Sequence, residues 1–217
     1  MVTATDIKTL RQRTGAGMLD CKKALNETEG DVEQAIDWLR EKGISKAAKK
    51  SSRVASEGIV ECYVHAGGKI GVMVEVNCET DFVALNDDFR ALARDIAMHI
   101  AAASPDFVAK EDVPADAIER ERSVQLARVI EEGKPEHIAE KIVEGRMSKY
   151  FEEVCLLEQV FVKDDKKTVS EVLTDQVATI GENIRIRRFE RFVMGEGLKK
   201  REDDFASEVA AVSGLEN

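Results

Sequence analysis

Residues 58–76 read GIVECYVHAGGKIGVMVEV, and this stretch decides the fold. From Ile70 to Val76 an apolar residue stands at every other position, and side chains at that spacing lie on one face of a β-strand. A second apolar run, Ile59–Val64, precedes it, and Ala66–Lys69 between the two runs has the composition of a short turn. The stretch therefore predicts a β-hairpin with one buried face.

Upstream of the hairpin, apolar residues recur at helical spacing in three short segments. These segments are Asp6–Leu10, Met18–Leu25 and Val32–Leu39. Thr14–Gly17 has the composition of a tight turn after the first, and Gly30-Asp31 ends the second and caps the third. Three short amphipathic helices can bury their apolar stripes only against one another, so this part predicts a compact three-helix unit.

Downstream of the hairpin, longer helices alternate with strands. Helices are expected at about Asp87–Ala103, Asp116–Glu131, Glu136–Phe151 and Thr168–Val177, and strands at Val154–Val162 and Asn183–Met194. Gly133–Pro135 is a turn short enough to make the second and third of these helices an antiparallel hairpin. Thr168 is the expected N-cap of the last helix, and the tail from Gly197 returns to helix.

This order of elements predicts an α+β fold with four parts. Residues 1–42 form a three-helix domain similar to ubiquitin-associated domains, and residues 43–57 form a basic, partly helical linker. Residues 58–196 form an α+β core with an antiparallel sheet and a helical hairpin, and residues 197–217 form a C-terminal helical part.

Composition and charge narrow the classes of partner. The chain has 217 residues, 43% of them hydrophobic, and 42 acidic against 32 basic residues give a formal charge of −10. A broad nucleic-acid surface is therefore not expected, and a protein partner or a small ligand is favoured. No apolar run approaches the roughly 20 residues that span a bilayer, and the first residues do not resemble a secretory leader. We expect a cytoplasmic protein without a membrane contact.

The pattern of reactive residues argues against an enzyme. Catalysis needs a constellation such as a nucleophile beside a base, and no local motif supplies one. Gly15–Gly17 is too short for a phosphate-binding loop and follows a predicted helix, which indicates a turn between helices. Cysteine and histidine are scattered without metal-ligand spacing, at Cys21, Cys62, Cys78, Cys155, His65, His99 and His137. We expect reduced cysteines, no catalytic residue, no cofactor and no metal.

The segment Thr80–Val83, called the TDFV segment below, stands between the predicted strand and the Asp87 helix. Apolar side chains just outside a strand usually pack beneath it, which would make Phe82 a core residue. The other interpretation is an exposed apolar side chain on a rigid turn, suited to insertion into a partner. Periodicity does not decide between the two.

Two segments resemble signature motifs of the bacterial translation elongation factor Ts family. They are Leu10–Leu25, LRQRTGAGMLDCKKAL, and Glu75–Val83, EVNCETDFV. The likeness continues through Ile96–Ala102, Gly133–Pro135, Val143–Met147 and Val193–Gly197, so it covers essentially the whole chain. The resemblance implies a guanine-nucleotide exchange factor that binds elongation factor Tu, disturbs its magnesium and phosphate site and promotes GDP release.

The resemblance also implies which residues touch the partner. In this family the segment matching Thr80, Asp81, Phe82 and Val83 inserts between two helices of elongation factor Tu, with Asp81 and Phe82 doing the inserting. His99 matches a histidine that presses on the partner near its phosphate-binding loop, although a histidine among apolar helix residues is also an ordinary core residue. Arg11, Met18 and Leu19 match contacts of the N-terminal unit, and Met18 and Leu19 fit its core equally well.

The length of the chain suggests a short form of this family. Longer members have two similar α/β subdomains, whereas the segment Gly181–Arg188, which resembles part of the first, occurs late in this sequence. Relatives of similar shortness pair two chains, which implies a homodimer; helices within one chain could instead cover the open sheet. The sequence also leaves a different class of function open. Gly30–Leu39 resembles the end of ubiquitin-associated domains, which would fit a ubiquitin-associated-type or ribosome-associated adaptor. Such an adaptor would have no nucleotide-exchange activity.

Overall fold

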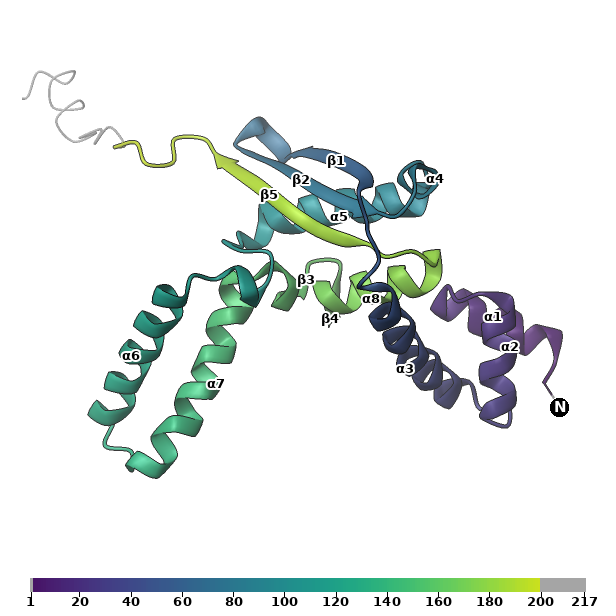
Figure 1. The fold of residues 1–217 in the computed structure, drawn as a ribbon, viewed down its shortest axis with the longest axis horizontal. Coiled ribbons are helices and arrows are strands. Elements are labelled where there is room, and N and C mark those ends of the chain that lie inside the picture. The colour runs from purple at the N-terminus through teal and green to yellow at the C-terminus, as the bar shows by residue number, and fades with distance from the viewer. Residues whose placement is uncertain (1, 200–217) are drawn as a thin grey trace, which may run out of the picture.

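The computed structural model describes residues 2–199, apart from the side chains of Glu136 and His137. Figure 1 shows a central sheet and two helical arms that diverge below it. One arm is the N-terminal helices, and the other is a long helical hairpin. The chain is thus extended rather than spherical, and each arm has a separate small core.

The N-terminal arm contains the three predicted helices, α1 (Ala4–Thr14), α2 (Met18–Glu27) and α3 (Val32–Lys50). Gly15 has a φ of 67° where α1 ends, a conformation that glycine adopts without steric cost. Asp31 caps α3 as expected, since its side chain accepts a hydrogen bond from the Gln34 backbone N–H. The buried residues that join the helices are Leu10, Cys21, Ala24, Leu25 and Ala35.

Helix α3 continues well into the predicted linker of residues 43–57. It ends at Lys50, and its second half packs along α8 (Val169–Ile180). The two helices approach closely because Gly43 has no side chain: a Cβ added there would lie 3.4 Å from the Ala178 Cβ. The N-terminal helices are therefore attached to the core by a packed helix.

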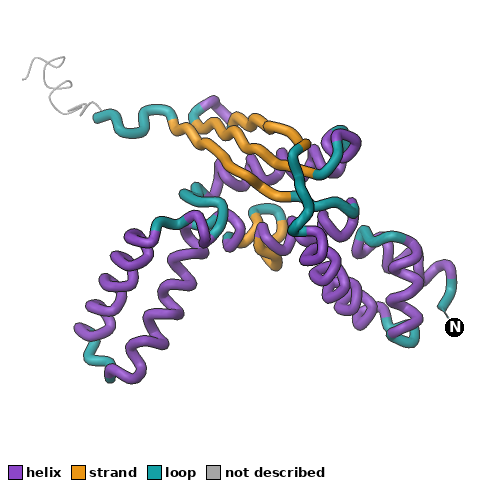
Figure 2. Tube along the Cα trace, viewed as in Figure 1, coloured by secondary structure: helices purple, strands orange, loops and turns teal. Residues whose placement is uncertain are grey.

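The central sheet is three-stranded and antiparallel, in the order β1 (Glu57–Val64), β2 (Ile70–Cys78), β5 (Arg185–Val193). The predicted hairpin is confirmed, with Val60 opposite Glu75 and Val64 opposite Gly71. A one-turn 3₁₀ helix at Ala66–Gly68 forms the connection. Helix α5 (Asp87–Ala103) covers one face of the sheet, as Figure 2 shows.

The main core lies between this sheet, α5 and α8. The alternating residues Val72, Val74 and Val76 point into it, and Phe89 and Ile96 of α5 meet them there. Thr168 caps α8, as the sequence predicts, and the structure adds a capping box with Glu171. The α+β fold class is thus confirmed.

The prediction of a strand at Val154–Val162 is mostly wrong. Helix α7 (Glu136–Val154) continues to Val154, and Leu156–Glu158 is a 3₁₀ turn. The run contains one short strand, β3 (Val160–Phe161), which pairs with β4 (Asp164–Thr168) in a second, separate sheet, and a single β-bridge from Cys155 to Phe107. A short apolar run can be buried in a turn as well as in a strand, so its hydrophobicity alone does not distinguish them.

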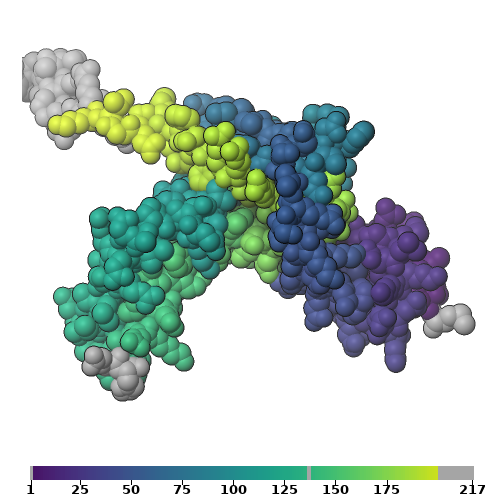
Figure 3. Space-filling view, viewed as in Figure 1, coloured from purple at the N-terminus to yellow at the C-terminus, as the bar shows by residue number. Residues whose placement is uncertain are grey.

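The helical hairpin agrees closely with the sequence. Helices α6 (Ala115–Glu131) and α7 are joined by a short turn at Gly133, and a short 3₁₀ helix, Lys110–Asp112, precedes them. Figure 3 shows the hairpin as a lobe that protrudes from the body of the molecule. Its own core consists of Val129, Ala139, Val143 and Met147, with Ile118, Ile142, Tyr150 and Phe151 packed against it.

The chain after β5 turns away from the sheet through residues 194–199. The predicted C-terminal helical part, 197–217, lies almost wholly outside the described residues. Among the helices that the structure describes, none combines the length and the apolar character needed to cross a membrane.

Candidate functional site

The TDFV segment begins two residues after β2 ends and forms the first part of a one-turn helix, α4 (Asp81–Ala84). Thr80 is its N-cap, and its hydroxyl oxygen accepts a hydrogen bond from the Val83 backbone N–H at 3.4 Å. Asn86 caps α5 directly afterwards by accepting from Asp88 and Phe89. The chain is thus fixed by a cap on each side of α4.

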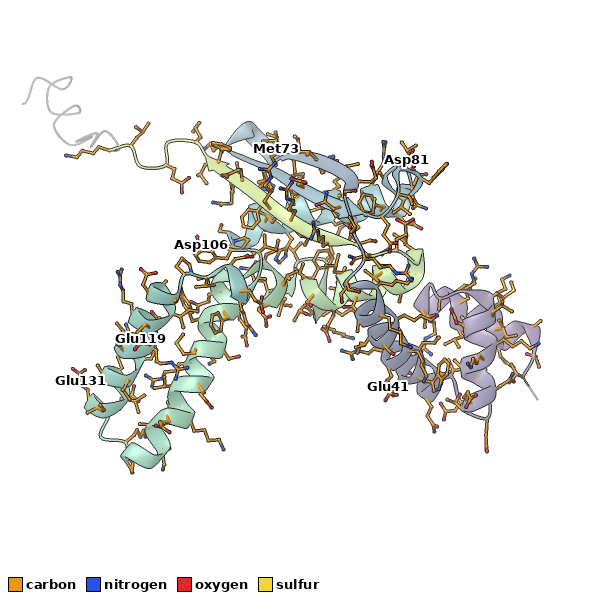
Figure 4. The ribbon with its side chains drawn as sticks, in the orientation of Figure 1. Glu41, Met73, Asp81, Asp106, Glu119 and Glu131 are labelled. Carbon is orange, nitrogen blue, oxygen red and sulfur yellow. The ribbon has the colours of Figure 1, made fainter. Side chains whose placement is uncertain are left out.

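The side chains of α4 divide between core and solvent. Ala84 is buried and Val83 is half-buried against the main core. Phe82 is 81% exposed, Leu85 just beyond the helix is 67% exposed, and Asp81 is exposed at the outer end of the sheet in Figure 4. The interpretation of Phe82 as a core residue is therefore wrong.

A glutamate from a distant part of the chain binds the start of the TDFV segment. One oxygen of the Glu182 carboxylate accepts hydrogen bonds from the Glu79 and Thr80 backbone N–H groups, both at 3.0 Å. Its other oxygen accepts from the Thr80 hydroxyl at 2.7 Å. Three donors are satisfied by one ionised side chain, an arrangement stronger than the same bonds to a neutral acceptor.

The next residue, Asn183, joins the same place to the end of α3. Its side-chain N–H groups donate to the backbone carbonyls of Ser51 at 3.3 Å and Arg53 at 2.7 Å. Its backbone N–H donates to Glu79 Oε1 at 2.6 Å, and Arg53 pairs with Glu79 at 3.5 Å. Asn183 is 7% exposed, so these bonds form away from bulk water.

The cysteine beside this cluster is not a nucleophile. Cys78 is buried, and its thiol donates to the Thr80 carbonyl at 3.1 Å. Burial, with the negative charge of Glu182 adding to it, raises the pKa of the Cys78 thiol to about 11. The group therefore remains a neutral thiol near pH 7 and acts as a hydrogen-bond donor.

The N-terminal candidates lie on the surface. Met18 and Leu19 begin α2 and are 59% and 84% exposed, and Arg11 on α1 is exposed as well. The same helix buries Cys21 and Ala24, so its first turn is left for contact with solvent or a partner. The interpretation of Met18 and Leu19 as core residues is wrong.

His99, in contrast, lies inside the molecule, and only 1% of it is exposed. Its Nε2 is 3.0 Å from Gln159 Oε1, and its Nδ1 accepts a hydrogen bond from the Val162 backbone N–H at 3.1 Å. These partners fix the neutral ring with the proton on Nε2, and burial lowers the pKa of His99. The ring positions β3 and offers no free nitrogen at the surface.

The structure brings together some of the predicted residues and leaves others apart. Figure 1 places α4 and the N-terminal helices at the same end of the molecule, with the hairpin of α6 and α7 at the other end. Glu182, Asn183 and Leu85 belong to this end but were not predicted. Glu182 has no local signal, since the residues that it binds lie about 100 positions earlier.

Other features of the described residues offer little chemistry. A groove of about 470 Å³ lies between the N-terminal helices and α8, and its lining includes Trp38, Lys42, Lys49 and Asp175. It presents lysines and acids but neither histidine nor cysteine. Over residues 2–199, apart from the two undescribed side chains, no three metal-binding side chains come together.

Comparisons with known proteins agree with the motifs. The family model described as Elongation factor TS matches residues 4–196. The protein called Elongation factor Ts in Geobacter sulfurreducens is 60% identical over 214 residues, which is 99% of each chain. Those of Desulforamulus reducens and Heliobacterium modesticaldum are each 61% identical, and the match covers 97% of this chain. Since family model and relatives span nearly the whole chain, this protein belongs to the elongation factor Ts family.

Proposed function

We propose that this protein is a guanine-nucleotide exchange factor for elongation factor Tu in translation elongation. It binds the GDP-bound partner and promotes release of GDP. The observation that supports this best is the exposure of Phe82 at the tip of a turn that is fixed at both ends. An exposed phenylalanine on a rigid turn loses little conformational entropy when it enters a partner.

In the proposed mechanism, Asp81 and Phe82 insert between two helices of elongation factor Tu. Thr80 holds them in place through its cap and through Glu182, and Val83 anchors the turn in the core. The displacement disturbs the magnesium and phosphate site of the partner. Loss of magnesium contacts weakens the binding of GDP to the partner, because the ion neutralises the negative charge of the phosphates.

Insertion of one side chain is too weak to account for exchange. A nucleotide held at nanomolar affinity is bound by about 12 kcal/mol, whereas burial of one phenylalanine contributes roughly 1.5–3 kcal/mol. Exchange therefore depends on coupling between two binding events. If the exchange factor binds the nucleotide-free partner more tightly than the GDP-bound partner, then by reciprocity it must lower the affinity of the partner for GDP. Several separate contacts have to contribute.

The N-terminal helices supply the second contact in this proposal. Met18 and Leu19 are large apolar side chains on the surface at the same end of the molecule as α4, and Arg11 adds a charge. His99 acts indirectly, since it binds the backbone of Val162 directly after β3 and so holds the exposed side chains of Val160 and Val162 in place. Nothing in the chemistry of this arrangement requires a catalytic step, a cofactor or a bound metal.

The adaptor alternative assigns no role to the TDFV segment. A ubiquitin-associated-type or ribosome-associated adaptor would use its N-terminal helices alone, and Phe82 would be free to change without effect. The neighbouring side chains of Phe82 and Leu85 are both exposed on and beside α4, and adjacent exposed apolar side chains are typical of an interaction site, which favours the exchange factor over the adaptor.

The test is release of labelled GDP from purified elongation factor Tu, with the native chain and Phe82→Ala compared. We expect the variant to slow stimulated release at least about tenfold, while its free energy of unfolding stays within about 1 kcal/mol of the native value. Ile130→Ala, at an exposed apolar position on α6 at the other end of the molecule, is the matched control and should leave release unchanged. Phe89→Ala, a fully buried phenylalanine, should lower stability by about 3–5 kcal/mol. Undiminished release by Phe82→Ala would exclude the proposed insertion.

A further inference from the structure

We infer that Glu182 and Asn183 are positioning residues that join the TDFV segment and the end of α3 into one rigid unit, so that both partner contacts keep a fixed spacing. This inference rests on the proposed function for its effect on exchange. The geometry itself is independent of that function. It consists of three chain segments meeting at two adjacent residues between α8 and β5.

The first part of the unit is the Glu182 carboxylate. Between Cys78 and α4 the chain leaves the sheet, so the Glu79 and Thr80 N–H groups have no strand partner there, and both donate to Glu182. Glu182 itself is held in place because α8 ends at Gly181, which has a φ of 92°. Without the carboxylate, two backbone donors and the Thr80 hydroxyl would lose their acceptor.

The second part is the Asn183 amide. Its two donor contacts reach the carbonyls of Ser51 and Arg53, directly beyond the last turn of α3. Its backbone N–H binds Glu79, the residue that also donates to Glu182. Glu79 thus lies at the centre of the cluster, with Arg53 on one side and Asn183 on the other.

The consequence concerns the distance between the two partner contacts. Helix α3 contains residues of the N-terminal core at its start and packs on α8 along its second half. The TDFV segment is bound to the residues that follow α8. Leu19 and Phe82 are therefore held at a fixed spacing before any partner binds. A partner that contacts both side chains does not lose free energy in ordering the N-terminal helices relative to α4.

Amide hydrogen exchange tests the geometry directly, with the full chain and without any partner. In Glu182→Ala we expect the amides of Glu79 and Thr80 to become at least about tenfold less protected, because their acceptor is gone. The amides of Val83, Ala84 and Leu85 should follow, because their bonds depend on the position of Thr80 and Asp81. Glu182→Gln retains an acceptor oxygen and should lose less protection. Glu190→Ala removes an exposed glutamate from β5, the strand that follows Glu182, and is the matched control, for which protection at 79–85 should not change.

GDP release tests the effect on function. With Glu182→Ala at saturating concentration, the maximal rate of release should fall roughly tenfold, and Glu182→Gln should restore much of it. Asn183→Ala should instead raise the half-saturating concentration more than it lowers the maximal rate, since it removes the bonds to the chain just beyond α3 and leaves Glu182 in place. A merely structural defect would lower the melting temperature and change both constants together.

The outcomes separate the inference from the proposed function. Unchanged protection at 79–85 in Glu182→Ala overturns the inference, whatever GDP release does. Lost protection with an unchanged rate also overturns it, provided that Phe82→Ala slows release. If Phe82→Ala leaves release intact, the proposed function fails, and hydrogen exchange alone decides whether Glu182 positions the segment.

Discussion

At the residue scale, Glu75 shows how one irregularity in a strand creates an electrostatic site. A β-bulge between Glu75 and Val76 leaves an extra residue on β5, so Arg187 and Arg188 both reach the Glu75 carboxylate, at 2.9 and 2.8 Å. Hydrogen bonds from Arg187 first and then Arg188 lower the pKa of Glu75 from 4.5 to about 2.

This pKa predicts a specific acid sensitivity. Because the folded-state pKa lies below the unfolded value, the contribution of Glu75 to stability is fully present above about pH 4.5 and is lost as the pH falls toward 2. Denaturant unfolding as a function of pH measures it. Glu75→Gln should remove this part of the pH dependence, and an unaltered profile in that variant would show that other carboxylates account for acid unfolding.

A second prediction at the residue scale concerns Leu19. Because its side chain is 84% exposed, Leu19→Ala should change the free energy of unfolding by less than about 0.5 kcal/mol. Affinity for elongation factor Tu should fall roughly five- to tenfold if Leu19 is a partner contact. Calorimetry measures the affinity, with Ile44→Ala on α3 as the exposed control. Equal affinities for native and variant chains would remove Leu19 from the interface.

At the element scale, the pairing of β1 with β2 depends on Gly58. Gly58 in β1 has a φ of 138°, and a Cβ there would lie 2.1 Å from the Val76 backbone oxygen. The conformation and the close approach both exclude a side chain. The strands meet correctly only because the residue at the start of the hairpin is glycine.

Gly58→Ala should therefore destabilise the protein by about 3 kcal/mol. Gly71→Ala is the matched control on the neighbouring strand, where an added Cβ meets no atom within 4 Å, and its effect should be small. Thermal and denaturant unfolding compare the two. Similar stability of both variants would mean that β1 shifts to accommodate a methyl group.

At the scale of the whole molecule, one face of the sheet has no cover among the described residues. Helix α5 packs on one face, and the other presents Val60, Val64, Met73 and Phe192, each at least 45% exposed. Met73 marks this face in Figure 4. The strand register places these side chains on the same side, together with Glu75, Arg188 and Glu190, so the face is an exposed apolar surface interrupted by charged side chains.

The predicted homodimer would bury this surface. In a twofold contact each chain covers the sheet of the other, because the same patch is self-complementary. Sedimentation or light scattering at micromolar concentration should give twice the chain mass of 24.0 kDa. Met73→Glu, which places a charge within the patch, should shift the mass toward one chain. A native chain that stays monomeric as concentration rises would exclude pairing.

The sequence by itself determined much of this protein. Strict alternation in 70–76 predicted the hairpin, helical spacing and the Asp31 and Thr168 caps located the helices, and two motifs indicated the family. These signals are local, because period and capping depend on residues at most a few positions apart. The predicted extents of the helical hairpin and of α5 agree with the structure for the same reason.

Only the tertiary structure decided which apolar residues are covered. A period tells which side chains share a face, but not what lies against that face, so Phe82 and Leu19 could be assigned to the surface only from the structure, and His99 to the core. Within the run 154–162, Leu156–Glu158 forms a 3₁₀ turn that buries Leu156 in the main core, whereas Val160 and Val162 are exposed. Glu182 binds the TDFV segment across about 100 residues, and a contact of that kind exists only once the chain has folded.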